Sequence, residues 1–230
     1  TDHYAYRGYE KAPDGSYIIN SNGLMVRSQY SSLIGYTDPD LEFGLANTFK
    51  YKDFTLTLNF DGRIGGKSWA NTEFYMYETG SHPDTDNQWR YDEVVNGKKN
   101  YVAEGVKVVS GEVTYDQYGR ITSDTRVFEK NDIETSYEDF VRGSRNNPDK
   151  LVQNKTFLKL REMSIGYNLP KAWVNKLGMN SMYAGLIGQN LFVLTKDFRF
   201  SDPDGFESVE GEDLASPSVR YIGVNLKVEF

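Results

Sequence analysis

The chain has 230 residues, with 17 Tyr, 13 Phe, 3 Trp and 21 Gly, no Cys, two His and a formal net charge of −7. Without Cys there is no disulfide framework, thiolate zinc site or cysteine nucleophile. With His only at positions 3 and 82, we expect neither a histidine metal site nor a Ser-His-Asp triad. The acidic balance argues against a nucleic-acid groove, which needs clustered Lys and Arg. We therefore expect no cofactor, no metal site and no catalytic residue.

No apolar run approaches the roughly 18 residues of a membrane helix, which excludes a helical membrane protein. It does not exclude a β-barrel, whose strands alternate apolar and polar residues. The chain begins Thr1-Asp2-His3 without a basic or apolar targeting segment, so we expect a processed chain or a piece of a longer one.

Alternation of apolar and polar residues predicts five strands. The clearest begins at Phe54, where four large apolar residues alternate with polar ones over 54–61. The run 42–51 alternates similarly, and its short link at 51–53 predicts a hairpin, which we extend to residue 77. Further strands are expected at 157–169, 181–195 and the C-terminus, where one face carries Ile222, Val224, Leu226, Val228 and Phe230.

Two of these strands are irregular. In 157–169, Leu158 and Leu160 fall on the polar parity, so the pattern frays at its start. In 181–195, both faces carry apolar residues, which equally fits a buried strand of a sandwich.

Short and long connections alternate along the chain. Residues 170–178 begin after Pro170 and end at Gly178, which predicts one or two helical turns. By contrast, 78–155 and 196–217 are long polar insertions, the first with strand-like runs near 101–109 and 112–128. This alternation is typical of outer-membrane barrels, in which tight turns lie at one end and long loops at the other.

Two blocks of residues carry recognisable motifs. The first comprises Ile34-Gly35-Tyr36-Thr37-Asp38-Pro39, Phe43-Gly44-Leu45, Tyr51-Lys52-Asp53-Phe54 and Asp61-Gly62-Arg63-Ile64-Gly65-Gly66. The second and more specific comprises residues 157–170 (FLKLREMSIGYNLP), Leu177-Gly178, Gly188-Gln189-Asn190-Leu191-Phe192, Asp202-Pro203 and the terminal Phe230. Both blocks resemble the C-terminal part of SusC/RagA-type TonB-dependent transporters, and the long insertion at 78–155 is unmatched.

The resemblance implies an all-β fold, in which this chain supplies about five C-terminal strands of an antiparallel transmembrane β-barrel of about 22 strands. Its expected parts are an outer loop and approach to a strand at 1–41, a barrel hairpin at 42–77, a long extracellular loop at 78–155, and the last three strands at 156–230 with an outer loop at 196–217. It further implies import of oligosaccharides or peptides across the outer membrane of a Gram-negative bacterium. The implied partners are a SusD-like surface lipoprotein, the TonB system acting through regions outside this chain, the barrel assembly machinery and outer-membrane lipid.

The C-terminal residues Tyr221, Val224, Leu226, Val228 and Phe230 resemble the signal by which outer-membrane proteins reach the barrel assembly machinery. The alternative is that Phe230 merely anchors a membrane interface.

Extending the parity of the 54–61 strand places Trp69, Tyr75 and Tyr77 on the lumen-facing side, where aromatic faces suit sugar or peptide ligands. The alternative is a bulge at Gly65-Gly66 that exchanges the faces, or a role in an aromatic girdle or loop packing.

Scattered acidic residues suggest two weaker hypotheses. The loop from Asp202 to Asp213 is acidic enough for calcium but lacks EF-hand spacing. The pairs Asp84/Asp86 and Asp92/Glu93 resemble glycosidase carboxylates only in type, and solvated loop acids explain them equally.

The sequence is compatible with three functions. Transport, with this chain as barrel wall and loop and without enzyme activity, fits best. A soluble all-β carbohydrate-binding module fits the acidic charge and the many Tyr and Trp, and a glycoside hydrolase rests only on scattered carboxylates.

Overall fold

The computed structural model describes residues 3–204, 214 and 218–230. The chain divides into two compact units. The sheet unit contains residues 38–67, 154–204 and 218–230 of the described chain, and the helical unit contains residues 3–37, 68–153 and 214.

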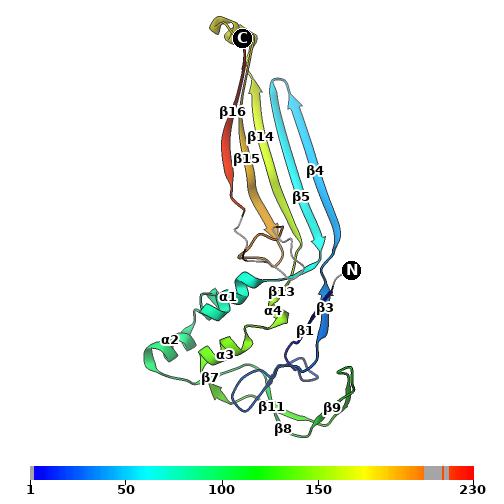
Figure 1. Ribbon diagram of the computed structural model, residues 1–230. Helices are drawn as coiled ribbons and strands as arrows, with labels where there is room; N and C mark the ends of the chain where they lie inside the picture. The colour runs from blue at the N-terminus through cyan, green and yellow to red at the C-terminus, as the bar shows by residue number, and fades with distance from the viewer. Residues whose placement is uncertain (1–2, 205–213, 215–217) are drawn as a thin grey trace. The chain divides into compact units, whose positions relative to one another are not determined.

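The sheet unit is built on five long antiparallel strands (Figure 1). Their order is β16-β15-β14-β5-β4, so every strand except the two at the edges has a partner on both sides. The strands are β4 Pro39–Tyr51, β5 Phe54–Gly65, β14 Phe157–Asn168, β15 Ser181–Thr195 and β16 Tyr221–Glu229. All five lie where alternation predicted them, although β4 begins three residues before the expected position 42.

Tight links join two of the strand pairs. Lys52 adopts a left-handed conformation, with φ of 50°, in the turn between β4 and β5. Between β14 and β15, helix α5 (Lys171–Val174) and the 3₁₀ helix η2 (Asn175–Leu177) stop at Gly178, where φ is 74°. The helical turns predicted at 170–178 are therefore confirmed.

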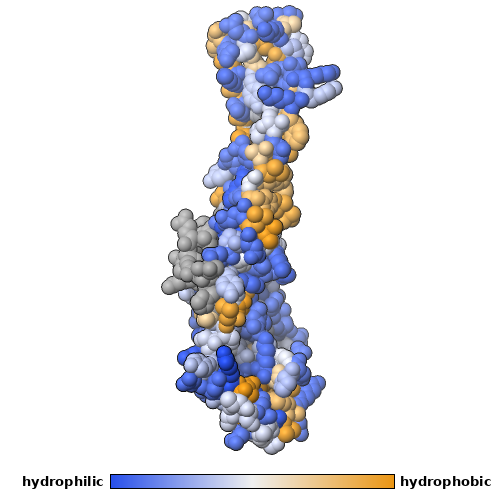
Figure 2. Space-filling model, turned by 90° about the vertical axis from the view of Figure 1, so that its right-hand side faces the viewer, coloured by the Kyte–Doolittle hydropathy of each residue, from blue (hydrophilic) through white to orange (hydrophobic). Residues whose placement is uncertain are grey.

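One face of the sheet is apolar across all five strands. Phe49 lies opposite Leu56, Leu56 opposite Ile165, Ile165 opposite Leu186, and Leu186 opposite Val224. Directly paired residues point to the same side, so these side chains form one continuous row. Large members of this apolar face are solvent-exposed, including Phe49 and Leu186 at 56% and Val224 at 77%. Figure 2 shows hydrophobic side chains gathered over the long strands in the upper part of the view.

The opposite, polar face carries the intervening residues. Thr57 lies opposite Thr48 and Ser164, and Asn225 lies opposite Gly185. The sheet thus has one apolar and one polar face, as expected of strands that border an apolar medium on one side and water on the other.

A β-bulge at Arg161 explains why the alternation of apolar and polar residues is irregular at the start of β14. Leu160 pairs with Phe60, whereas Glu162 pairs with the next residue, Asn59, so β14 has one extra residue here. The extra residue shifts the parity and places Leu158 and Leu160 on the same apolar face as Met163.

The helical unit combines short strand pairs with four helices. The helices are α1 Asn71–Thr79, α2 Gln88–Asn96, α3 Tyr137–Ser144 and α4 Pro148–Leu151, with the 3₁₀ helix η1 at Pro83–Thr85. The strand pairs are β1 His3–Tyr6 with β3 Ser32–Tyr36, β7 Tyr101–Val102 with β12 Glu134–Thr135, and β9 Val113–Tyr115 with β10 Ile121–Asp124; β8 Val106–Ser110 lies between β2 Ile18–Ile19 and β11 Val127–Lys130. The strand-like runs predicted near 101–109 and 112–128 are therefore present, but the helices of this insertion were not predicted.

The core of this unit is small. Trp69, Leu151 and Val152 form its buried cluster, and the Tyr6 ring stacks on Trp69 with centroids 4.6 Å apart. Trp69 belongs to β6 (Lys67–Trp69), which pairs with β13 (Val152–Asn154).

The extension of the barrel hairpin to residue 77 is wrong. Strand β5 ends at Gly65, because Gly65 and Gly66 adopt φ values of 80° and 76°, which break the extended backbone. After the short β6, residues 71–79 form helix α1, which ends at Gly80 in the left-handed conformation. Within the described residues, no helix combines the length and apolar character needed to cross a membrane.

Candidate functional site

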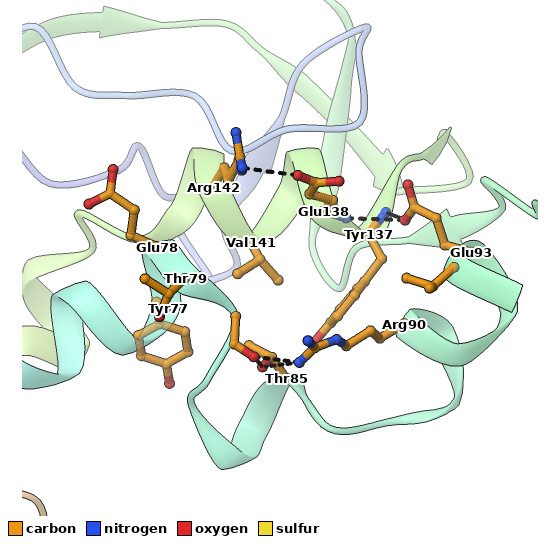
Figure 3. A pocket seen from close by; sticks show the side chains of 12 residues that line it. Tyr77, Glu78, Thr79, Thr85, Arg90, Glu93, Tyr137, Glu138, Val141 and Arg142 are labelled. Carbon is orange, nitrogen blue, oxygen red and sulfur yellow. Dashed lines mark hydrogen bonds and ion pairs between the residues drawn. The ribbon is translucent and has the colours of Figure 1, made fainter.

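The helical unit contains a cavity of about 190 Å³ lined by residues of α1, η1, α2 and α3 (Figure 3). Its lining mixes acidic, basic and aromatic groups, which are Tyr77, Glu78, Thr79, Gly80, Thr85, Arg90, Glu93, Val94, Tyr137, Glu138, Val141 and Arg142. We call it the Arg90 cavity.

Helix termini determine where these side chains lie. The left-handed Gly80 ends α1, and the side chain of Asn87 begins α2 by accepting a hydrogen bond from the Arg90 N–H. Ser136 begins α3 in the same way, with its hydroxyl accepting from the Asp139 N–H at 3.2 Å. Three helix ends therefore meet around one small space.

Glu93 of α2 holds the N-terminus of α3. Its carboxylate accepts hydrogen bonds from the Ser136 hydroxyl and from the backbone N–H groups of Tyr137 and Glu138, the last two at 2.6 and 3.1 Å. Burial alone would raise the pKa of Glu93, but these donors, with Lys99 nearby, outweigh it and lower the pKa below its ordinary value. Glu93 is thus a charged clamp between two helices.

Arg90 and Tyr77 fix the opposite wall. The Arg90 guanidinium donates to the Gly80 carbonyl and, at 3.2 Å, to the Thr85 hydroxyl (Figure 3). The Tyr77 hydroxyl donates to Asp84 at 2.8 Å, and burial together with Asp84 raises the Tyr77 pKa. Tyr77 is consequently a neutral donor at physiological pH.

The remaining lining is open to a ligand. Val94 is 77% exposed, and Glu138 and Arg142 form a solvent-exposed pair at 3.1 Å. Val94 and Val141 are the aliphatic residues of the lining, which also carries charges of both signs. This arrangement suits binding of a small amphipathic group.

The three predicted substrate-binding aromatics do not share a face. Tyr77 lines the Arg90 cavity, Trp69 is only 6% exposed in the core, and Tyr75 is 45% exposed on α1. The strand parity that grouped them fails because residues 71–79 are helical. Their contact with substrate stays a prediction.

Three of the four acids considered for glycosidase chemistry have structural partners. Asp84 accepts from Tyr77, Asp92 accepts from Gln88 at 3.0 Å, and Glu93 caps α3. Among the described residues, no cluster of three or more His, Asp or Glu is arranged to hold a metal ion. Of the acidic loop considered for calcium, Glu207, Glu210, Glu212 and Asp213 lie outside the described residues.

A second polar cluster, on the sheet unit, was not predicted. The Lys159 ammonium, with 1% of the residue exposed, lies 2.6 and 2.8 Å from the two Asp202 oxygens and 2.9 Å from Asp204 Oδ1. Its fourth neighbour, at 3.0 Å, is the Ser218 hydroxyl. The cluster joins β14 to residues on both sides of the connection between β15 and β16.

Arg161, the bulge residue, extends the cluster. Its Nε and Nη2 donate to Asp61 at 2.9 and 2.5 Å, and it also pairs with Asp204. Burial and the neighbouring Asp204 carboxylate raise the pKa of Asp202. The Asp202 and Asp204 carboxylates are the counterions of Lys159 and Arg161. This pairing could not be predicted from the sequence, because the partners are 43 to 45 positions apart.

The proposed assembly residues lie on the edge strand β16. Val224 and Leu226, with Val228, point to the apolar face opposite Leu186, Ala184 and Met182, whereas Tyr221, opposite Gln189, points to the polar one. Phe230 is 85% exposed. Recognition by the assembly machinery stays a prediction.

The chain is similar in sequence to a TonB-dependent receptor and in fold to peptide importers. The TonB-dependent receptor P3 of Formosa agariphila is 27% identical over 208 residues, which cover 86% of this chain and 17% of that protein. In fold, the chain is similar to the RagAB peptide transporter, with a TM-score of 0.59 at 16% identity, over 99% of this chain and 23% of that one. The RagAB peptide importer in its closed-closed and open-open states gives TM-scores of 0.57 and 0.52, at 15% and 14% identity, over 99% of this chain and 23% and 22% of those chains.

No family model matches the chain. The resemblance to SusC/RagA-type TonB-dependent transporters is nevertheless confirmed by these likenesses in sequence and fold. The names of the relatives describe a receptor and importers, in agreement with a non-enzyme. The chain spans less than a quarter of each of these proteins.

Glu93→Gln is expected to weaken the N-terminus of α3. A group with a lowered pKa stabilises the fold above its ordinary value of 4.5, and this stabilisation disappears as the pH falls through the folded value. Hydrogen exchange, corrected for intrinsic rates, should show α3 keeping its protection in the natural protein while the pH stays well above 4.5, and losing it as the pH falls below 4.5. The variant should be less protected at pH 7, by about 1–3 kcal/mol, and nearly independent of pH.

Glu138→Gln is the matched control, because its carboxylate forms only an exposed pair worth less than about 1 kcal/mol. Equal effects of the two substitutions would contradict the role of Glu93.

Lys159→Met is expected to release the segment Asp197–Asp204, because it leaves Asp202 and Asp204 without their shared cation. Breaking a buried pair in this way typically costs about 3–5 kcal/mol. Limited proteolysis of the purified protein should cut this segment faster. Lys50→Met, at an exposed position of β4, should leave the cleavage pattern unchanged. An intact segment in Lys159→Met would show that the cluster does not hold it.

Proposed function

We propose that the chain forms the C-terminal wall and part of the outer loops of a TonB-dependent transporter that imports oligosaccharides or peptides across the outer membrane of a Gram-negative bacterium. The observation that carries this proposal is the apolar face, which runs without interruption across five strands and is exposed on each. Contiguous apolar surface of this kind marks contact with lipid or another protein.

The free edges of the sheet support a barrel. Strand β4 pairs only with β5 and β16 only with β15, so both edges present unpaired backbone groups within the described chain. In lipid each unpaired group costs several kcal/mol, and five strands are too few to close. We infer that strands outside this chain pair with β4 and β16 and complete a barrel of about 22 strands.

The pairing register of the strands argues against a soluble sandwich. A sandwich requires the apolar faces of the 54–61 and 222–230 strands to pack against each other. Both belong instead to the same face of one sheet, linked through Ile165 and Leu186. They cannot form the two opposing layers of a sandwich.

The proposal extends to the remaining parts of the chain. Residues 78–155 are the extracellular part, and the Arg90 cavity is their candidate contact with substrate or with a SusD-like lipoprotein. Energy from the TonB system acts through regions outside this chain, and Phe230 with its strand serves the barrel assembly machinery.

Single cysteines on β16 test the lipid contact, since the natural chain has no Cys. Val224→Cys and Asn225→Cys are neighbours on opposite faces. In intact outer membranes a water-soluble maleimide should label Asn225→Cys and spare Val224→Cys, and both should react after unfolding. Equal labelling of the two in the membrane would contradict the barrel.

Uptake by the producing bacterium tests the transport itself. A strain lacking the protein should lose import of one fluorescently labelled class, oligosaccharides or peptides, and the natural gene should restore it. A protonophore should abolish the restored uptake, because TonB-dependent import draws on the proton gradient of the inner membrane. Unchanged uptake of both classes, or recovery of the protein in the soluble fraction, would contradict the proposal.

A further inference from the structure

The sheet unit has a cavity of about 270 Å³ beside β15, separate from the Arg90 cavity. Pairing between β15 and β16 ends at Gln189 and Tyr221, so beyond this point no residue of β16 pairs with β15. The lining there comes from Asn190 on β15, from Arg199 and Asp202 after it, and from Ser218 and Arg220 before β16.

Two guanidinium groups in this lining have no counterion among the described residues. Arg199 and Arg220 are exposed, and neither makes an ion pair or side-chain hydrogen bond with residues 3–204, 214 or 218–230. The one carboxylate of the lining, Asp202, is bonded through both oxygens to Lys159 at 2.6 and 2.8 Å. Asp202 therefore balances Lys159, and within the described part of the chain the two guanidinium charges of the lining remain unpaired.

The chemistry of these groups selects oxyanions. A guanidinium presents parallel N–H donors that match the geometry of a carboxylate or sulfate, and charge-assisted bonds of this kind are about twice as strong as neutral ones. The Ser218 hydroxyl adds a polar group, while one donor of Asn190 is already bonded to the Val219 carbonyl at 3.1 Å. The volume lies just below the usual range for small-molecule sites, so it fits a single sugar or amino-acid unit.

We propose that Arg199 and Arg220 form a binding site for an oxyanion group, a carboxylate or sulfate, carried on a unit of this size. As a substrate subsite it rests on the proposed import, and it then selects acidic nutrients over neutral ones. Binding of the anion itself does not depend on transport.

Isothermal titration calorimetry of the whole purified protein in detergent tests the site directly. The anionic probes are sodium sulfate, glucuronate and N-acetylglutamate, and the neutral matched probes are glucose and N-acetylglutamine. We expect at least one anionic probe to bind, with an affinity that falls as NaCl is raised, and the neutral probes not to bind. Preference for glucuronate or for N-acetylglutamate identifies a sugar acid or an acidic peptide as the source of the group, and equal binding of sulfate identifies the bare oxyanion.

Substitutions locate the binding. Arg199→Gln and Arg220→Gln should each weaken it about tenfold or more. Arg199→Lys, which keeps the charge but loses the paired donors, should weaken it less. Arg120→Gln, at an exposed arginine of the helical unit, is the matched control and should bind normally.

The proposal is overturned if no anionic probe binds, or if both Gln variants bind as tightly as the natural protein. Import of labelled nutrient can persist in either case, so failure here is distinguishable from failure of the transport function.

Discussion

The constraint on which the sheet unit depends is the exposure of one whole apolar face. Phe49, Leu56, Ile165, Leu186 and Val224 lie in a row across five strands, and water is a poor solvent for such a surface. At roughly 25 cal/mol per Å² of apolar area, each large side chain in the row gains about 1.5–3 kcal/mol when it leaves water. An apolar neighbour of that face explains why its large side chains are not covered by other parts of the sheet unit.

On the polar face of the sheet, buried charges are paired with opposite charges. Lys159 and Arg161 share Asp61, Asp202 and Asp204 in a compact cluster, in which each buried charge has a partner at hydrogen-bond distance. Farther along the same connection, Arg199 and Arg220 have none among the described residues. The contrast separates charges that stabilise the fold from charges that are available to a ligand.

The sheet could be predicted from the sequence because a strand with two different environments must repeat every second residue. Residues 54–61 show this period without error, and β14 shows it on either side of its bulge. The helical unit could not be predicted in the same way. Its helices are short, and α1 contains Phe74, Tyr75, Met76 and Tyr77 in succession, a run without a helical period. The Arg90 cavity depends on Glu93 reaching Ser136, 43 positions away, and no local pattern encodes such a contact.

The bulge at Arg161 divides β14 into two segments that are out of phase by one residue. The segment before it places even-numbered residues on the apolar face, and the segment after it places odd-numbered residues there. An exchange of strand halves between related genes would therefore preserve the apolar face only if the breakpoint kept this single extra residue. The same residue supplies the guanidinium that joins Asp61 to Asp204, so the phase of the strand and its polar cluster are inherited together.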